Sequence, residues 1–314
     1  MKETILITGS SGYVGGRLAK YLAQNTKHYL LLGVRGNISN PPSWLTNGEI
    51  IKLDVLNDNQ LITACERATV IIHLAAINEI DCLRNPESAV NINTLGTLKL
   101  LRSAEKNGVN KIIYFSTAHV YGELIGKITE NTLPRPTHPY AITHKAAEDF
   151  ILASHHEKKI IGIVLRLSNS FGVPERHQVN RWTLVVNDLC KQVVTTGEMV
   201  LNSSGLQRRD FITLDDVCRA VDHTITLSDV EYGDGVFNLG GENALRIIDI
   251  VDLISIRCEN IFGFKPNIQC ENTSDETSPS LEYSIDKFKA TGFSLDRNFE
   301  KEIDATLNLC KKVF

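Results

Sequence analysis

The first sixteen residues constrain the fold of this chain more than any other stretch. An apolar and β-branched run from Lys2 to Thr8 breaks into Gly9-Ser-Ser-Gly12-Tyr-Val-Gly15-Gly16, and a helical pattern follows. A strand, a glycine-rich turn and a helix in this order are typical of dinucleotide binding, because the free N–H groups of the helix N-terminus face the pyrophosphate. We expect Gly9 to permit the tight turn, Gly12 to admit the pyrophosphate and Gly15 to let the helix pack on the strand. Such turns also occur in unrelated α/β proteins, so the rest of the chain must show whether this one binds a dinucleotide.

Apolar runs alternate with helical patterns over the first half of the chain. Strands are expected at 2–8, 29–34, 49–53, 70–74, 111–115 and 160–167, and helices at 61–67, 86–107 and 139–156. Strands that are apolar throughout indicate a parallel sheet covered on both faces, so the expected class is α/β, a Rossmann-like doubly wound sheet. We expect 1–168 with about 236–249 to form the dinucleotide-binding domain. A smaller C-terminal substrate-binding lobe is expected from 169–235 and 250–314.

Composition and net charge indicate which classes of binding partner are not expected. The net charge is −4 and the basic residues are dispersed, which argues against nucleic acid. No stretch reaches about 18 apolar residues, and a strand begins almost at once, so neither a membrane span nor a signal peptide is expected. The seven cysteines are scattered without a Cys-x-x-Cys pair, as in reduced cytoplasmic proteins, and no residues have the spacing of metal ligands.

A series of short motifs, each weak alone, is specific in its order and spacing. They are Thr8-Gly9-x-x-Gly12-x-x-Gly15, His73-Leu-Ala-Ala76, Asn91-Ile-Asn93-Thr-Leu-Gly96-Thr97, Ser116-Thr117-Ala-His-Val-Tyr121-Gly122, Arg166-Leu-Ser-Asn169-Ser-Phe-Gly172, Arg209-Asp210-Phe211 and Phe237-Asn238-Leu-Gly240. From residue 4 to about 300 the chain resembles the extended short-chain dehydrogenase/reductase family, in the nucleotide-sugar epimerase, dehydratase and reductase group.

The resemblance implies two sets of ligand contacts. Residues that would bind the dinucleotide are Gly9, Ser11, Gly12, Tyr13, Val14, Gly15, Arg35, Asp54, Val55, Leu74, Ala75, Ala76, Asn93, Ser116, Tyr140 and His144. Those that would bind a nucleotide-diphosphate sugar are Thr117, Ala118, His119, Asn169 and Arg209. Arg209 also suits this role physically, because a guanidinium can bind phosphate oxygens in pairs.

The resemblance further implies a catalytic set of Thr117, Tyr140 and the residue four places after the tyrosine. Tyr140 would exchange a proton with a sugar oxygen while hydride moves to or from the nicotinamide, and Thr117 would position that oxygen. The family has lysine at the third place, where this chain has His144, and Lys145 comes one residue late. Residues i and i+4 share a helix face, whereas i+5 is turned about 100° away. His144 replaces the lysine, or a local bulge brings Lys145 in, or the site binds cofactor with little redox activity.

Two further positions bear on cofactor and reaction. The second strand ends in Arg35 with no carboxylate nearby, which favours NADP(H) over NAD(H), although Arg35 could also be a solvated loop residue. Dehydratases of the family carry Asp-Glu after the threonine, where this chain has Ala118 and His119. A 4,6-dehydratase is therefore disfavoured, and a C4 epimerase, a 4-dehydrogenase and a 4-ketoreductase remain. A non-catalytic dinucleotide sensor or scaffold is the alternative.

The resemblance also implies a setting and an assembly. Such enzymes supply sugars for cell-surface polysaccharides. Family members pair the helices at about 86–107 and 139–156 into a dimer, so a homodimer is expected. Core burial alone would explain the apolar residues of these helices almost as well.

Overall fold

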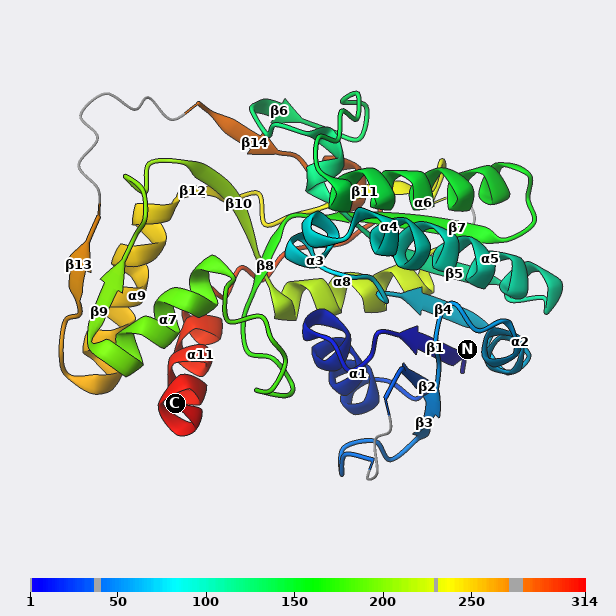
Figure 1. Ribbon diagram of the computed structural model, residues 1–314, viewed down its shortest axis with the longest axis horizontal. Coiled ribbons are helices and arrows are strands. Elements are labelled where there is room, and N and C mark those ends of the chain that lie inside the picture. The colour runs from blue at the N-terminus through cyan, green and yellow to red at the C-terminus, as the bar shows by residue number, and fades with distance from the viewer. Residues whose placement is uncertain (1, 37–40, 229–230, 271–278) are drawn as a thin grey trace.

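The architecture is organised around one parallel sheet (Figure 1). The computed structural model describes residues 2–36, 41–228, 231–270 and 279–314. Seven strands pair in parallel in the order β11 (Val236–Leu239), β7 (Ile161–Leu167), β5 (Lys111–Thr117), β4 (Val70–His73), β1 (Thr4–Thr8), β2 (Tyr29–Val34) and β3 (Gly48–Lys52). The order reverses direction at β1 and β4, which confirms the doubly wound Rossmann-like class.

Helices cover both faces of the sheet because its strands are apolar on both sides. One core contains side chains of α1 (Tyr13–Asn25), α8 (Leu214–Thr226) and α10 (Asp286–Lys289) packed against the sheet. The opposite core contains side chains of α2 (Asp58–Cys65), α5 (Gly96–Lys106) and α6 (Pro139–His156). This double coverage is what the uninterrupted apolar strands predict.

The stretch at 79–107 differs from the single helix expected at 86–107. It consists of α3 (Glu79–Arg84), α4 (Pro86–Ala89), the π-helical segment η1 (Val90–Leu95) and α5. In η1 the N–H of Gly96 donates to the carbonyl of Asn91, five residues earlier. A π-turn widens the helix locally, and such turns often accompany functional sites. Here it places Asn93 against the loop after β4 and against α6.

A second group of elements lies beyond the carboxyl ends of the sheet strands, at the left in Figure 1. It comprises β8 (Asn169–Phe171), α7 (Val185–Thr196), β9 (Glu198–Val200), β10 (Arg208–Thr213), β12 (Ala244–Arg246), α9 (Ile247–Phe262), β13 (Asn267–Gln269) and α11 (Phe299–Val313). Helices α7, α9 and α11 share their own apolar core. The short strands β6 (Gly126–Ile128) and β14 (Leu281–Tyr283) pair with each other, and the 3₁₀ turn η2 (Ala118–Tyr121) follows β5.

The boundaries expected for the two lobes remain a proposal. Helices α8 and α10 fall within the ranges assigned to the smaller lobe, yet both pack against the large sheet. Chain crossings therefore join the two parts at several points. Within the described ranges, no helix has the length and apolar character needed to cross a lipid bilayer.

Candidate active site

A cavity of about 460 Å³ opens at the carboxyl ends of the central strands, between the sheet and the β8–β10 region. Crevices at this edge of an open α/β sheet are where ligands commonly bind. The cavity brings together the following residues predicted from the sequence: Gly9, Gly12, Tyr13, Val14, Gly15, Leu74, Ala76, Ser116, Thr117, His119, Tyr140, His144, Asn169 and Arg209.

The glycine turn forms one wall of this cavity and has no room for side chains. Gly9 has a φ of +68°, and a Cβ there would lie 2.9 Å from the backbone nitrogen of Ala75. A Cβ on Gly15 would lie 2.3 Å from the carbonyl oxygen of Gly9, so the first turn of α1 packs directly on the strand end. These are the roles expected for Gly9 and Gly15. The exposed backbone beside the N-terminus of α1 is a surface that a dinucleotide pyrophosphate fits.

The opposite wall carries two of the side chains expected to be catalytic. Thr117 ends β5, and Tyr140 is the second residue of α6, whose first turn is capped by the His138 side chain accepting from the Tyr140 N–H. Enclosure of the phenol and the nearby carboxylate of Glu79 raise the pKa of Tyr140 to about 12, against the smaller opposing effects of Arg181 and Thr117. A phenol in this environment carries its proton at neutral pH.

His144 lies one helical turn after Tyr140, and the two ring centroids are 4.5 Å apart. Its Nδ1 lies 2.6 Å from the hydroxyl oxygen of Tyr114 on β5, whereas its buried Nε2 has no partner among the described residues. Burial lowers the pKa of His144 to about 4, although the backbone of Phe115 opposes this shift. The imidazole is therefore uncharged at neutral pH.

Lys145 does not take the place of His144. Helix α6 continues without a break from Pro139 to His156. The ammonium of Lys145 pairs with the carboxylate of Asp149 and lies 3.8 Å from that of Glu148. The local bulge considered from the sequence is absent in this helix, so that interpretation is wrong.

The side of the cavity expected to bind substrate is formed by two neighbouring strands. Asn169 on β8 pairs with Phe211 on β10, and its side chain donates to the carbonyl of Asp210. Buried Asp210 accepts hydrogen bonds from Ser168, from the N–H of Gly241 and from the N–H of Asn243, which fixes the strand beside it. Next to Asp210, Arg209 lines the cavity, so its guanidinium is available to an anionic ligand there.

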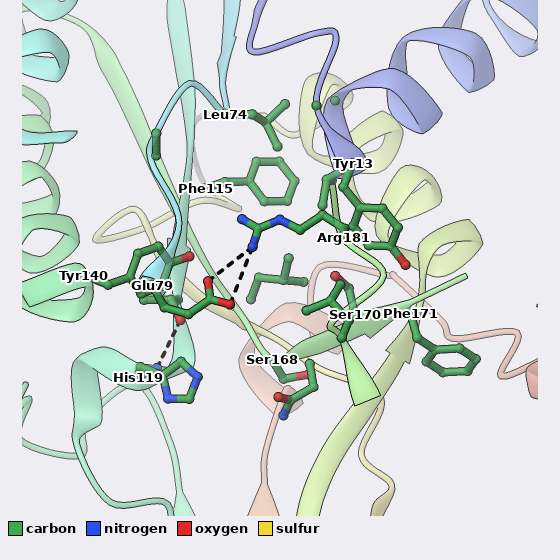
Figure 2. Close-up of a pocket in the computed structure, with 18 of the residues that line it drawn as sticks. Tyr13, Leu74, Glu79, Phe115, His119, Tyr140, Ser168, Ser170, Phe171 and Arg181 are labelled. Carbon is green, nitrogen blue, oxygen red and sulfur yellow. Dashed lines mark hydrogen bonds and ion pairs between the residues drawn. The ribbon is translucent and has the colours of Figure 1, made fainter. Parts of the chain in front are cut away.

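His119 faces the same space from η2. Its backbone N–H donates to the Thr117 hydroxyl, as Figure 2 shows. Enclosure and the nearby guanidinium of Arg209 lower the pKa of its imidazole. It is accordingly an uncharged polar group on the substrate side of the cavity.

Two contacts at the site escaped the sequence prediction. Arg181 reaches across the cavity to Glu79, with 3.3 Å between Nη1 and Oε2, beside Tyr140 (Figure 2). Tyr114 supports His144 from behind. Asn180, Thr183, Leu184 and Val185, from the segment that follows β8, also line the cavity. None of these residues belongs to a motif with a fixed spacing, so only the fold could bring them to the site.

Some residues expected at the ligand do not line the cavity in the described structure: Ser11, Arg35, Asp54, Val55, Ala75, Asn93 and Ala118. Asn93 is fully engaged behind the wall, where its Oδ1 accepts from the Ile77 N–H and its Nδ2 donates to Thr143. Exposed Arg35 follows β2 at the carboxyl edge of the sheet, and Asp54 lies just after β3. Their contacts with a ligand remain predictions.

Residues 5–240 match the model of the NAD dependent epimerase/dehydratase family. That match spans well over half of the chain. The chain belongs to this family.

Relatives of the family differ in their reactions. The low-salt glycan biosynthesis protein Agl12 of Haloferax volcanii is 26% identical over 97% of this chain and 97% of its own length. The dTDP-D-glucose 4,6-dehydratase of Mus musculus is 25% identical over 99% of this chain and 90% of its own.

Solved structures share the fold. UDP-glucuronic acid 4-epimerase from Bacillus cereus, in complex with NAD, has a TM-score of 0.83 and 24% identity, covering 99% of this chain and 97% of its own. RMD from Pseudomonas aeruginosa, complexed with NADPH, has a TM-score of 0.81 and 22% identity, covering 99% and 98%. At these identities the similarity establishes the epimerase/dehydratase fold of this chain, and its reaction must be argued from the site.

Proposed function

We propose that this member of the epimerase/dehydratase family is an NAD(P)-dependent nucleotide-sugar oxidoreductase that transfers hydride at the sugar C4. The supporting observation is that Thr117 and Tyr140 meet in one cavity, between the glycine turn and Arg209. That order along the cavity suits a dinucleotide on the first side, a sugar in the middle and a diphosphate at the far side. Sugar nucleotides for cell-surface polysaccharides are the expected products.

Each residue has a distinct role in the proposed reaction. A bound nicotinamide would supply or accept the hydride. Tyr140 exchanges a proton with the C4 oxygen, and the Thr117 hydroxyl holds that oxygen in place. Arg209 binds the diphosphate with the support of Asn169. Because the pKa of Tyr140 is raised to about 12, its phenol carries the proton that the reduction of a carbonyl oxygen would take up.

The choice of cofactor and the exclusion of dehydration depend on single residues. Arg35 at the end of β2 favours NADP(H), since its guanidinium can bind a ribose 2′-phosphate. The solved relatives include one bound to NAD and one bound to NADPH. Dehydratases also occur among the relatives, but Ala118 and His119 stand where the resemblance implies an Asp-Glu pair in a dehydratase.

Isotope transfer tests the proposal. The purified protein is incubated with UDP- or dTDP-sugars deuterated at C4 and with NAD⁺ or NADP⁺, and the dinucleotide and the sugar are analysed by mass spectrometry. Transfer of deuterium to the nicotinamide, or conversely from deuterated NADPH to a 4-ketosugar, supports the proposal. We expect Tyr140→Phe to reduce the rate roughly 10²–10⁴-fold while dinucleotide affinity stays within a few-fold. No transfer with any of these sugars would contradict it.

A dinucleotide-binding sensor or scaffold is the second candidate. It is favoured by one observation, the uncharged His144 where the family has lysine. A sensor would bind NAD(P)H with micromolar affinity and show no isotope transfer, and its affinity would be insensitive to Tyr140→Phe. Transfer that depends on Tyr140 would exclude it.

Assembly and location are further parts of the proposal. Exposed apolar side chains on η1 and α6, and on α3 beside α6, are compatible with the homodimer expected through about 86–107 and 139–156. A cytoplasmic location remains a prediction from the sequence. Sedimentation of the purified protein, and fractionation of cells that express it, would check the two.

A further inference from the structure

Two buried histidines, His73 at the end of β4 and His144 on α6, differ in their hydrogen bonds, because only His73 has a partner for each ring nitrogen. The Nδ1 of His73 lies 2.6 Å from the Thr8 hydroxyl, and its Nε2 lies 2.9 Å from that of Thr97. The Thr8 oxygen also accepts from the N–H groups of Leu74 and Ala75, and the Thr97 hydroxyl donates to the carbonyl of Asn93. These bonds are mutually consistent only if His73 carries its proton on Nε2. Both ring nitrogens of His73 are therefore bonded within the protein, and its role is structural.

His144 is equally buried, but one of its ring nitrogens is left without a hydrogen bond. It is 3% exposed and lines the cavity. Its Nε2 has no hydrogen-bond partner among the described residues, unlike either nitrogen of His73. A buried polar atom without a partner costs about 1–3 kcal/mol, so its retention at a cavity wall indicates that a ligand supplies the missing bond.

Tyr114 determines which nitrogen of His144 carries the proton. In the described part of the chain, the only hydrogen-bond partner of its hydroxyl is the Nδ1 of His144, at 2.6 Å. Burial raises the pKa of Tyr114 well above its ordinary value, so the phenol keeps its proton. If Nδ1–H donated to the phenol oxygen, the buried phenol proton would have no acceptor. The phenol therefore donates to Nδ1, and the proton of the imidazole lies on Nε2.

The surroundings of His144 keep it uncharged. The titratable groups that face it are His73 from β4, Tyr114 from β5 and Tyr140 from its own helix, with Glu148 one turn further along α6 and the Glu79–Arg181 pair beyond Tyr140. Two neighbouring buried imidazoles repel each other when protonated, and burial disfavours either cation. No carboxylate among the described residues pairs directly with His144 to offset this.

We propose that Tyr114 is a positioning residue that holds His144 as an uncharged donor, whose Nε2–H binds a hydroxyl oxygen of the ligand in the cavity. An uncharged N–H suits a hydroxyl acceptor, whereas a phosphate would favour a cation such as Arg209. The position of His144 one turn from Tyr140 places this donor beside the proton-exchanging phenol. The assignment rests on the proposed function only in taking the ligand to be a dinucleotide.

Nitrogen-15 NMR on the ligand-free protein tests, without reference to activity, whether Tyr114 holds the proton of His144 on Nε2. Histidines are labelled with ¹⁵N, and His144 is assigned by difference from His144→Gln. We expect the Nε2–H pattern, without titration between pH 5.5 and 8.5. In Tyr114→Phe we expect a mixture of tautomers, whereas Tyr283→Phe, which removes another buried hydroxyl bonded to a backbone carbonyl, leaves the pattern unchanged. An Nδ1–H pattern, or titration near pH 6.5, would overturn the proposal.

Dinucleotide binding tests whether the Nε2–H of His144 donates to the ligand. Saturation with NADPH, or with NADH if that binds more tightly, should shift the His144 Nε2–H resonance. We expect His144→Phe to weaken binding roughly 3- to 10-fold and Tyr114→Phe by a smaller factor, with Tyr283→Phe unchanged. Tight binding that leaves the resonance and the His144→Phe affinity unchanged would overturn the donor role. A protein with the Nε2–H pattern that binds neither dinucleotide would contradict the proposed function instead, since the tautomer assignment would stand.

Discussion

The guanidinium of Arg166 makes two hydrogen bonds to the carboxylate of Glu148, at 3.0 and 2.8 Å, in the interior of the protein. Both side chains are almost fully buried, and Arg166 also donates to the Tyr121 hydroxyl at 2.9 Å. Glu148 lies one turn after His144 on α6, and Arg166 is on β7. The pair therefore fastens the helix that carries Tyr140 and His144 to the central sheet.

Breaking this pair on one side should destabilise the protein strongly. Glu148→Gln leaves the buried guanidinium of Arg166 without a countercharge, and such removal costs about 3–5 kcal/mol. Urea unfolding should show a free energy of unfolding lower by that amount. Glu282→Gln, at the exposed Lys127–Glu282 pair, is the matched control and should change it by less than about 1 kcal/mol.

The double variant Arg166→Met with Glu148→Leu tests whether the two residues are energetically coupled, so that each is needed mainly because the other charge is buried beside it. It removes both charges, so its loss should be clearly smaller than the sum of the single losses. Additive losses would contradict the direct coupling of the two residues.

Acid should weaken the fold through the two buried histidines. The pKa of His144 is lowered to about 4 and that of His73 to about 3, both by burial. Unfolded histidine takes up a proton near pH 6.5, before the folded state does, so stability is fully present above pH 6.5 and falls as the pH drops toward 4. At pH 4 the free energy of unfolding is lower by about 3 kcal/mol because of His144 alone.

Urea unfolding at pH 7.5, 6, 5 and 4.5 measures this dependence. His144→Gln should remove up to one proton from the difference between the states, which flattens the slope by as much as about 1.4 kcal/mol per pH unit. His156→Gln, near the C-terminus of the same helix, is the control. Identical slopes in all three proteins would contradict a neutral buried His144.

The sheet and its helices could be predicted because burial on both faces leaves a direct signature. Strand β2 and helix α6 have the bounds expected from the sequence, at 29–34 and 139–156. The π-turn at η1 was not predicted, because an apolar pattern of period 3.6 does not reveal one widened turn. Helix α3 lies between motifs and was too short for a periodic signal.

The site was predictable only where chemistry fixes the residue spacing. Gly15, Thr117 and Tyr140 follow from motifs and line the cavity. Tyr114 did not stand out, because it is one aromatic residue in a strand that is buried throughout. Its hydrogen bond to His144 depends on how β5 packs against α6, which the sequence does not express locally.

Cofactor preference should depend on Arg35. Arg35→Glu replaces a cation with an anion at the end of β2, so NADPH binding should weaken by roughly 10-fold or more while NADH binding holds or improves. Fluorescence titration gives both dissociation constants. Arg102→Glu, an exposed change on α5, serves as the control for net charge. Equal loss of both dinucleotides, or no change in NADPH affinity, would contradict the NADP(H) preference.

Exposed apolar side chains gather on the helices expected at a dimer interface and on α3, which packs beside α6. Leu83 on α3 is 63% exposed, Val90 on η1 52% and Phe150 on α6 41%. Leu83→Glu with Phe150→Glu should therefore shift the protein from dimer to monomer, because buried carboxylates oppose association. Sedimentation velocity at micromolar concentration measures this. Leu133→Glu, at a residue that is 65% exposed in the segment between β6 and α6, should leave the dimer intact. A native protein that sediments as a monomer, or a dimer that both sets of changes leave intact, would contradict assembly through these helices.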